Sequence, residues 1–388
     1  MRHLPAECGA RARCPGTGHH RGDAAGDRGQ AGEPGLAGDV VLIRFRGAAP
    51  GWSAGQNGTV STLMLTEGIP AMRLRILSFA MPMSVVAVCI VTGVAGPVSA
   101  AEQRLPGPLV DVAWLQQHLD DVVVLDVRRD PDQFAEGRIP GARLLDWSAV
   151  RDDRIIDGVE FQMILPEPAT FEGLMQAAGV DSGDAIVVTS PGKAAADVTV
   201  AARVLWQLKY FGHDAVALLD GGTAAWTGEG GALETGEAAS TEGDFRVLTE
   251  RPELLVESQG VLDRLGAEGV QLIDNRPQPF FLGLEQEDYV YAPGHIPGAI
   301  NIPFTLNTEV SAPAFIREPD DLLAAYRTLG LDPAAEELIA YCNSGHVSAL
   351  TWFVLHELMG LEQARLYDGS MHAWTLDETR PVANPLAR

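Results

Sequence analysis

The sequence predicts an α/β protein of two tandem domains, each with a mostly parallel central sheet flanked by helices. Short runs of Val, Ile and Leu alternate with longer segments of helical periodicity, which is typical of parallel α/β units. This pattern occurs twice, and two pairs of matching residues keep the same separation: Asp126 and Asp274, like Trp226 and Trp374, lie 148 residues apart. A chain of 388 residues is long enough for two such domains.

The two repeats carry matching segments in the same order. The first matching segments are a strand (123–128 and 271–276), a segment with an Ile-Pro-Gly turn (134–147 and 291–304) and a helix (167–181 and 318–332). A second strand (185–190 and 337–342) and a segment with an Asp-Gly turn (218–227 and 366–375) follow. We therefore expect an N-terminal domain over residues 105–228 and a C-terminal domain over residues 250–385. Residues 229–249, rich in Gly, Glu, Ser and Thr, are expected to form a surface linker.

The first hundred residues differ from the rest of the chain. Residues 1–71 show little periodicity and are predicted to be disordered, or to be an overextended gene start. Residues 72–100 have the features of a secretory signal peptide: Arg73 and Arg75, an apolar run, and a small-residue cleavage site ending at Ala100. We therefore expect a periplasmic or secreted protein, with a retained membrane anchor as the alternative.

Only one cysteine follows the predicted cleavage site. Of Cys8, Cys14, Cys89 and Cys342, the last alone lies in the predicted domains, so an exported chain could form no internal disulfide. The thiol at residue 342 must then serve packing, pairing between chains, or chemistry. The net charge of −24 argues against a nucleic acid or an anionic membrane surface as a partner.

The segment AYCNSGHVSALTWF (340–353) places Cys342 between a predicted strand and a predicted helix. A loop that leads into a helix stabilises a thiolate with its backbone N–H groups and the helix dipole. We expect the loop residues Asn343, Ser344, Gly345, His346 and Val347 to bind an anionic substrate in front of the sulfur. Ser344 and His346 offer side-chain donors, although His346 could also be only a solvated loop residue. Ser348 is expected to cap the helix.

Arg276 is the candidate substrate-binding residue outside this loop. Asp274 and Arg276 recur as Asp126 and Arg128 in the half that has no thiol, which favours a structural ion pair. A position facing the substrate is the alternative. No metal site is expected, because His346 is the only other good ligand near Cys342.

Two other enzyme classes built on a reactive cysteine fit less well. A phosphatase loop needs an arginine six residues after the cysteine, and that position is Ser348. A disulfide exchanger needs a second cysteine three residues on, and that position is Gly345.

The chain resembles the tandem-domain rhodaneses, the thiosulfate and 3-mercaptopyruvate sulfurtransferases. The resemblance covers roughly residues 105 to 380 and rests on YAPGHIPGAINI, ARLYDGSMHAW and the loop CNSGHV, together with the duplication and the first half's lack of a thiol. It implies two rhodanese-like domains with the active site in the second. It also implies a sulfurtransferase in which Cys342 takes a sulfane sulfur from a small-molecule donor and passes it to a thiophilic acceptor, without a metal or cofactor. A protein acceptor of the sulfur is a further possibility under this resemblance.

The choice of donor depends on departures from the family pattern. Thiosulfate enzymes resemble CRKGVT in the active loop and mercaptopyruvate enzymes resemble CGSGVT, whereas Asn343 and His346 match neither. Mercaptopyruvate enzymes also tend to carry several arginines in the stretch that begins at Asp274. Here Arg276 is kept, Phe280 replaces the next arginine, and the last is missing. These differences favour thiosulfate or a persulfide donor over 3-mercaptopyruvate. A sulfur carrier or binding module without turnover is the non-enzymatic alternative.

Overall fold

The computed structural model describes residues 104–238 and 241–387. The predicted disordered start (1–71) and the predicted signal peptide (72–100) lie outside the described residues. Among the helices of residues 104–238 and 241–387, none has the length and apolar character needed to cross a membrane.

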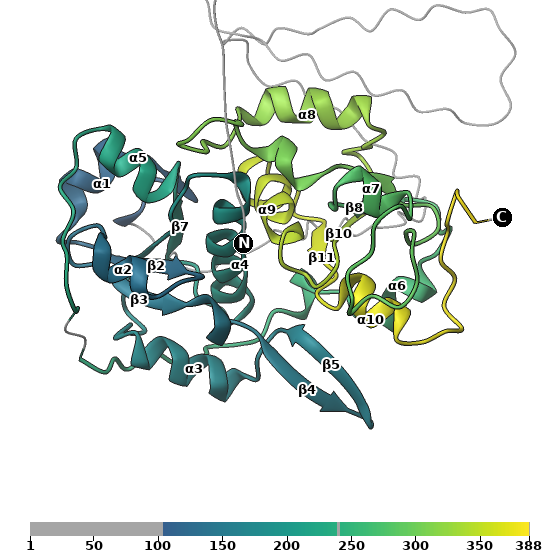
Figure 1. Cartoon of the computed structure of the whole chain (residues 1–388), viewed down its shortest axis with the longest axis horizontal. Helices are drawn as coiled ribbons and strands as arrows, with labels where there is room; N and C mark the ends of the chain where they lie inside the picture. Colours follow the sequence, from purple (N-terminus) through teal and green to yellow (C-terminus); the bar gives the residue numbers. More distant parts are fainter. Residues whose placement is uncertain (1–103, 239–240, 388) are drawn as a thin grey trace, which may run out of the picture. The chain divides into compact units, whose positions relative to one another are not determined.

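The N-terminal half is built on a parallel five-stranded sheet in the order β1-β7-β6-β2-β3 (Figure 1). Helices α3 and α4 pack on one face of this sheet, and α1, α2 and α5 pack on the other. The elements are β1 (Leu109–Val110), α1 (Val112–His118), β2 (Val123–Arg128), α2 (Asp132–Glu136), β3 (Arg143–Asp146), β4 (Asp152–Ile156), β5 (Val159–Ile164), α3 (Pro168–Ala177), β6 (Ile186–Thr189), α4 (Ala195–Tyr210), β7 (Val216–Leu219) and α5 (Gly222–Gly228).

The C-terminal half repeats this plan with a parallel four-stranded sheet in the order β11-β10-β8-β9. Helices α8 and α9 pack on one face, and α6 and α10 pack on the other. The elements are α6 (Ser258–Asp263), β8 (Val270–Asp274), α7 (Gln278–Phe281), β9 (Ile300–Asn301), α8 (Pro319–Thr328), β10 (Glu337–Tyr341), α9 (Ser348–Trp352), a π-helical continuation of α9 (Phe353–Leu358), β11 (Ala364–Leu366) and α10 (Ser370–Thr375). The prediction of two α/β units with mostly parallel sheets is confirmed.

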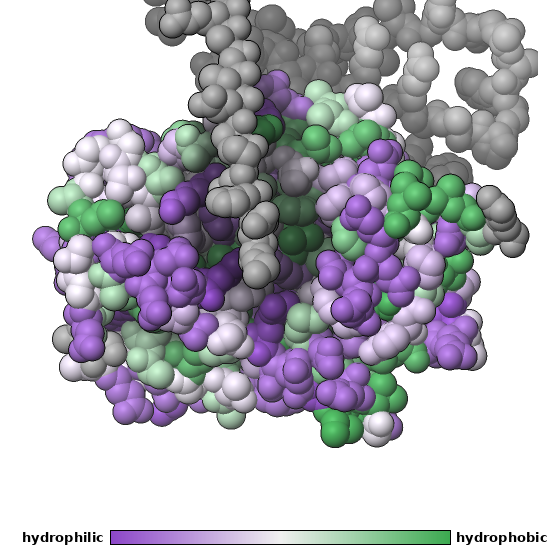
Figure 2. Space-filling view, viewed as in Figure 1, coloured by the Kyte–Doolittle hydropathy of each residue, from purple (hydrophilic) through white to green (hydrophobic). Residues whose placement is uncertain are grey.

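The N-terminal half also carries an antiparallel hairpin that the repeat pattern did not predict. Strands β4 and β5 pair around Asp157–Gly158, where both residues have positive φ. Ile155, Ile156 and Val159 are exposed near the turn. Figure 2 shows hydrophobic residues at the place where Figure 1 shows the tip of this hairpin.

The two halves share one apolar core. Helix α4 packs against α9, and both helices lie between the two sheets (Figure 1). Helix α4 is therefore buried on nearly every side, from Val198 to Leu208. Most of these buried side chains are apolar, as expected of a helix enclosed by protein, but Thr199, Arg203 and Gln207 are buried with them.

A reciprocal pair of hydrogen bonds also joins the halves. Asp220 follows β7 and accepts from the backbone N–H of Ile316 at 2.8 Å. Asp368 follows β11, in the equivalent place of the second repeat, and accepts from the N–H of Leu165 at 2.7 Å. Leu165 and Ile316 also correspond, since each precedes a Glu-Pro pair that begins a helix. Each half therefore uses the aspartate after its last strand to hold the same segment of the other half.

The loop of the first half that corresponds to the cysteine loop takes part in this contact. Ser190 stands where the second half has Cys342, and the carbonyl of Gly192 accepts from the N–H of Ala314 at 2.8 Å. The first half therefore uses this loop to bind the second half.

The two aspartates have different electrostatic environments. Asp368 pairs with Arg203 in the interior. Burial raises the pKa of Asp220 to about 6, and the negative charges of Glu309 and Glu318 act in the same direction. A carboxyl whose pKa is raised in the folded state stabilises the fold fully below its unfolded pKa, and this contribution is lost as the pH rises through the folded pKa.

We predict that Asp220→Asn reduces this pH dependence. Between pH 4 and pH 7 the wild type should lose about 1–3 kcal/mol of unfolding free energy relative to the variant, because only the wild type ionises. Denaturant unfolding of both proteins at several pH values measures the difference. A difference that stays constant from pH 4 to pH 7 would contradict the raised pKa.

Candidate active site

Cys342 lies at the carboxyl edge of the second sheet, where the strand order changes direction. From β8 the chain passes to β9 on one side, and then to β10 and β11 on the other. Arg276 follows β8 and Cys342 follows β10, so both lie at this switch point. In open α/β sheets the carboxyl ends of strands at such a point form the usual binding crevice.

The side chain of Ser370 holds the loop after Cys342. The Ser370 hydroxyl accepts from the N–H groups of Cys342 and Gly345, each at 3.0 Å, and donates to the carbonyl of Tyr367 at 2.8 Å. Ser370 has a φ of +49°, and its counterpart in the first repeat is Gly222, with a φ of +59°. The second half thus keeps a strained left-handed serine where the first half has a glycine, and the hydroxyl supports the loop.

Gly345 is required by the shape of the same loop. Its φ is +66°, and a Cβ there would lie 2.5 Å from the carbonyl and carboxylate oxygens of Asp368. No other residue fits this position without moving the turn after β11.

The sulfur of Cys342 is nearly enclosed. Cys342 is 2% exposed, and the Ser348 hydroxyl donates to Sγ at 3.3 Å. Among the described residues, the N–H groups of Asn343, Ser344, His346 and Val347 have no hydrogen-bond acceptor. The loop therefore has four free N–H donors, as expected of a loop that binds anions.

Ser348 does not cap α9, so that expectation is wrong. The residue at the N-cap position is Val347, which makes no side-chain cap, and Ser348 is the first residue of the helix. The Ser348 hydroxyl donates to the sulfur of Cys342 instead.

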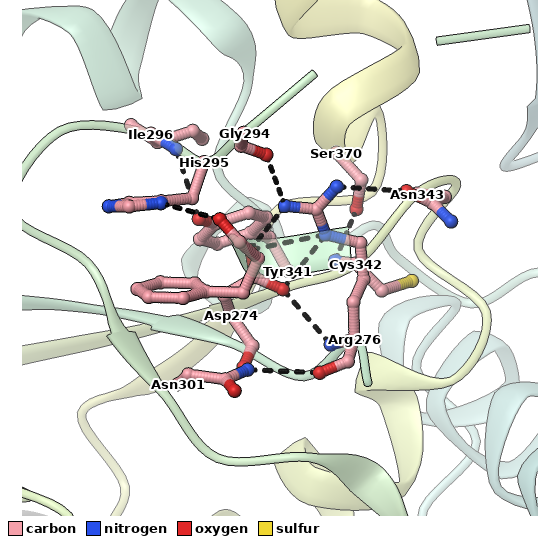
Figure 3. A network of polar contacts seen from close by, with 11 residues as sticks. Asp274, Arg276, Gly294, His295, Ile296, Asn301, Tyr341, Cys342, Asn343 and Ser370 are labelled. Carbon is pink, nitrogen blue, oxygen red and sulfur yellow. Dashed lines mark hydrogen bonds and ion pairs between the residues drawn. The ribbon is translucent and has the colours of Figure 1, made fainter. Parts of the chain in front are cut away.

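Arg276 forms a closed network below the loop (Figure 3). Its Nη2 donates to Asp274 and to the Gly294 carbonyl, each at 2.6 Å, and its Nε donates to both oxygens of the Asp274 carboxylate. Nη1 reaches Asn343 Oδ1 at 3.3 Å. Arg128 makes the matching pair with Asp126 in the first half. The structural ion pair is therefore present in both halves, and Arg276 positions Asn343.

A buried ion pair brings the first half to the cysteine loop. Arg203 of α4 has no exposed surface, and its Nη1 donates to Asp368 and, at 3.0 Å, to the carbonyl of Gly345. Arg203 thus joins the loop and the turn after β11 with one guanidinium group. Because a charge left alone in the interior is costly, this contact fixes both segments.

Trp147 of the first half contacts two arginines of its own half and His346 of the second half. Its ring lies 5.3 Å from the Arg129 guanidinium, 4.4 Å from that of Arg151 and 4.4 Å from the His346 ring. His346 Nε2 also contacts Thr199 Oγ1 at 2.8 Å and Arg129 at 3.3 Å. His346 is therefore half-buried in a contact between the halves.

The titratable groups around the sulfur are shifted by these neighbours. Burial, together with the positive charges of Arg151, Arg129 and Arg203, lowers the pKa of His346 well below its usual value. Its imidazole is therefore neutral at neutral pH. Burial raises the pKa of Tyr289 to about 12, and the negative charge of the Cys342 thiolate adds to the shift.

Several residues of this site were missed by the sequence analysis. Trp147, Arg151 and Arg203 belong to the first half, and no local pattern indicates that they face Cys342. Ser370 ends the quoted Asp-Gly-Ser turn, and its difference from Gly222 in the matching repeat was a usable signal. Of the predicted loop, Ser344 contacts Arg151 Nη1 at 3.5 Å, and Val347 is half-buried at the start of α9.

Comparisons with known proteins match this architecture. The Rhodanese-like domain matches twice, at residues 111–229 and 258–377. A probable 3-mercaptopyruvate sulfurtransferase of Pseudomonas aeruginosa is 36% identical, over 68% of this chain and 92% of the relative. A putative thiosulfate sulfurtransferase of Saccharopolyspora erythraea is 31% identical, over 71% and 96%. The solved structure of SseA from Escherichia coli, a rhodanese-fold 3-mercaptopyruvate sulfotransferase, is 29% identical with a TM-score of 0.60, over 68% and 98%.

We predict that Ser370→Ala lowers the unfolding free energy by about 1–3 kcal/mol, because two buried N–H groups lose their acceptor. Ser370→Gly should be less destabilising than Ser370→Ala by about 1 kcal/mol, since glycine adopts the left-handed conformation without strain. Denaturant unfolding of both variants, with the exposed Ser311→Ala as control, measures these effects. Equal stability of Ser370→Ala and the wild type would exclude the supporting role.

Proposed function

Since the chain belongs to the rhodanese family and is a sulfurtransferase, we propose that it transfers a sulfane sulfur from thiosulfate or a related donor through a persulfide on Cys342. The observation that carries this proposal is the position of Cys342, a lone thiol at the head of a loop of free amides. A single thiol is sufficient, because the sulfur moves in two displacement steps.

In the first step the Cys342 thiolate attacks the outer sulfur of thiosulfate. A bond forms between Sγ and that sulfur, and the sulfur–sulfur bond of thiosulfate breaks. Sulfite leaves with the bonding electron pair. The Ser348 hydroxyl donates a hydrogen bond to Sγ, and the loop has unpaired amides at residues 343, 344, 346 and 347 to stabilise the charge that develops.

In the second step an acceptor takes the sulfur. Cyanide attacks the outer sulfur of the persulfide, a carbon–sulfur bond forms, and thiocyanate leaves. The electron pair of the broken bond returns to Cys342 as the thiolate. The step from the cyanide anion moves no proton, so it needs no general acid or base.

The choice between thiosulfate and 3-mercaptopyruvate rests on which N–H groups of Arg276 remain free to bind a substrate. Three hydrogen bonds to Asp274 and one to Gly294 occupy its Nε and Nη2. Phe280 stands where mercaptopyruvate enzymes tend to carry a further arginine. A carboxylate donor would lack a free bidentate partner here, which supports thiosulfate over 3-mercaptopyruvate.

A dedicated sulfur carrier is the second candidate. The persulfide on Cys342 would then be passed to a protein thiol instead of to a small molecule. Retention of a stable persulfide with little turnover on cyanide would favour this alternative.

We also propose that the mature protein is exported after cleavage behind Ala100. The support is Arg73 and Arg75, the apolar run that follows them, and the small residues before the cleavage site. The N-terminal sequence of protein recovered from the periplasm or the medium tests this proposal.

We predict that Cys342→Ser abolishes thiocyanate formation, whereas Ser311→Ala, a change at an exposed position, leaves it intact. The purified protein is incubated with thiosulfate or with 3-mercaptopyruvate, cyanide is added, and thiocyanate is measured. Turnover should be greater with thiosulfate. The persulfide should appear in the mass spectrum as one added sulfur on the peptide that contains Cys342.

Two results would change this conclusion. Thiocyanate formation that survives Cys342→Ser would place the chemistry elsewhere. Absence of both thiocyanate and the added sulfur in the wild type would contradict the persulfide mechanism, whereas the added sulfur alone would indicate the carrier.

A further inference from the structure

We propose that Arg151, contributed by the half without a thiol, binds the anionic leaving group of the sulfur donor at Cys342. This inference rests on the proposed sulfur transfer and specifies the donor class. It gives the N-terminal half a direct part in the substrate site.

The position of Arg151 brings it to the cysteine loop. Arg151 directly precedes β4, so it lies at the base of the β4–β5 hairpin. Its Nη1 lies 3.5 Å from the hydroxyl of Ser344, two residues after Cys342. Ser344 itself is 5% exposed. The guanidinium group therefore faces the loop from the opposite half of the molecule.

The charge of Arg151 has no counter-ion within the described residues. Arg203 pairs with Asp368 and Arg276 pairs with Asp274, but no carboxylate lies within ion-pair distance of Arg151 among residues 104–238 and 241–387. Its Nε is buried and has no hydrogen-bond partner there. A half-buried guanidinium with unused donors beside a reactive thiol is suited to an anionic ligand.

The surroundings of Arg151 are short of negative charge. Burial lowers the pKa of Arg151 to about 10, and the positive charges of Arg203 and Arg129 act in the same direction. The residue still carries its charge at neutral pH. Tyr289 and the Cys342 thiolate act in the opposite direction, but Tyr289 is uncharged at neutral pH because its own pKa is raised to about 12.

Trp147 holds the guanidinium plane in place. The Arg151 guanidinium carbon lies 4.4 Å from the centre of the Trp147 ring, and the ring is itself 6% exposed. Stacking of this kind restricts the rotation of a long side chain before the ligand arrives. A preorganised donor loses less entropy on binding than a free surface arginine.

The chemistry of the first step defines the ligand. Sulfite departs with an electron pair and gains negative charge on its oxygens as the sulfur–sulfur bond breaks. A planar guanidinium group offers parallel N–H donors to two of these oxygens. Donors with a sulfonate, sulfinate or comparable oxyanion next to the transferred sulfur fit this arrangement. Transfer from the persulfide to cyanide has no such leaving group, so Arg151 should matter less in that step.

The test uses Arg151→Gln and Arg151→Lys in the full chain, with Arg154→Gln as the matched control. Arg154 lies in β4, three residues after Arg151, and pairs with Glu167. In Arg151→Gln the KM for thiosulfate should rise about 10- to 100-fold, since a charge-assisted contact is lost. The rate at which cyanide discharges a preformed persulfide should change much less. Arg151→Lys should fall between the wild type and Arg151→Gln, and Arg154→Gln should match the wild type.

A second measurement needs no turnover. Iodoacetate and iodoacetamide alkylate the Cys342 thiolate with loss of iodide, and they differ in charge. Arg151 should favour the anionic reagent, so the ratio of the two rates should fall at least about fivefold in Arg151→Gln and less in Arg151→Lys. Equal losses of both rates would show that Arg151 acts on the thiolate alone, and an unchanged ratio would also overturn the proposal. Alkylation does not depend on sulfur transfer. A wild type that forms neither thiocyanate nor the added sulfur on Cys342 would therefore refute the proposed function, and the alkylation ratio would still decide on Arg151.

Discussion

The buried pair between Arg203 and Asp368 is the interaction on which the active loop depends. One guanidinium group from α4 binds both the Asp368 carboxylate and the carbonyl of Gly345. The same carboxylate holds the N–H of Leu165. The cysteine loop, the turn after β11 and the first half are therefore fixed by one set of contacts. Removing either charge would leave the other unpaired in the interior, so the loop cannot rearrange independently of the contact between the halves.

Because the chain is duplicated, the contact made by Asp368 has a counterpart at Asp220. The two contacts differ because only Asp368 has an arginine partner. Asp220 holds Ile316 as Asp368 holds Leu165, so both contacts descend from the same repeat unit. Arg203 lies 148 residues before Thr351, the separation that also relates the two aspartates. Only the second aspartate therefore has an arginine partner. The first has glutamates nearby and titrates near pH 6.

The half without a thiol contributes contacts to the active site. Its cysteine-equivalent loop binds the second half through Gly192, and its hairpin base and Trp147 present basic side chains to Ser344 and His346. The half without a thiol thus binds and orients, while the other half carries the reactive sulfur. The chain carries many more acidic than basic residues, so a group of arginines at the reactive loop attracts anions locally.

The sequence by itself determined the two-unit α/β architecture, the reactive residue and the internal Asp–Arg pairs. These features are written in local periodicity, in a strand–loop–helix pattern and in residues that repeat at a fixed separation. Only the tertiary structure decided which residues surround Cys342. Ser348 was expected to cap a helix but bonds the sulfur, and Arg151 lies 191 positions from the thiol it faces. No local pattern encodes such contacts, because they depend on how α4 and α9 pack and on the angle at which the hairpin meets the second half.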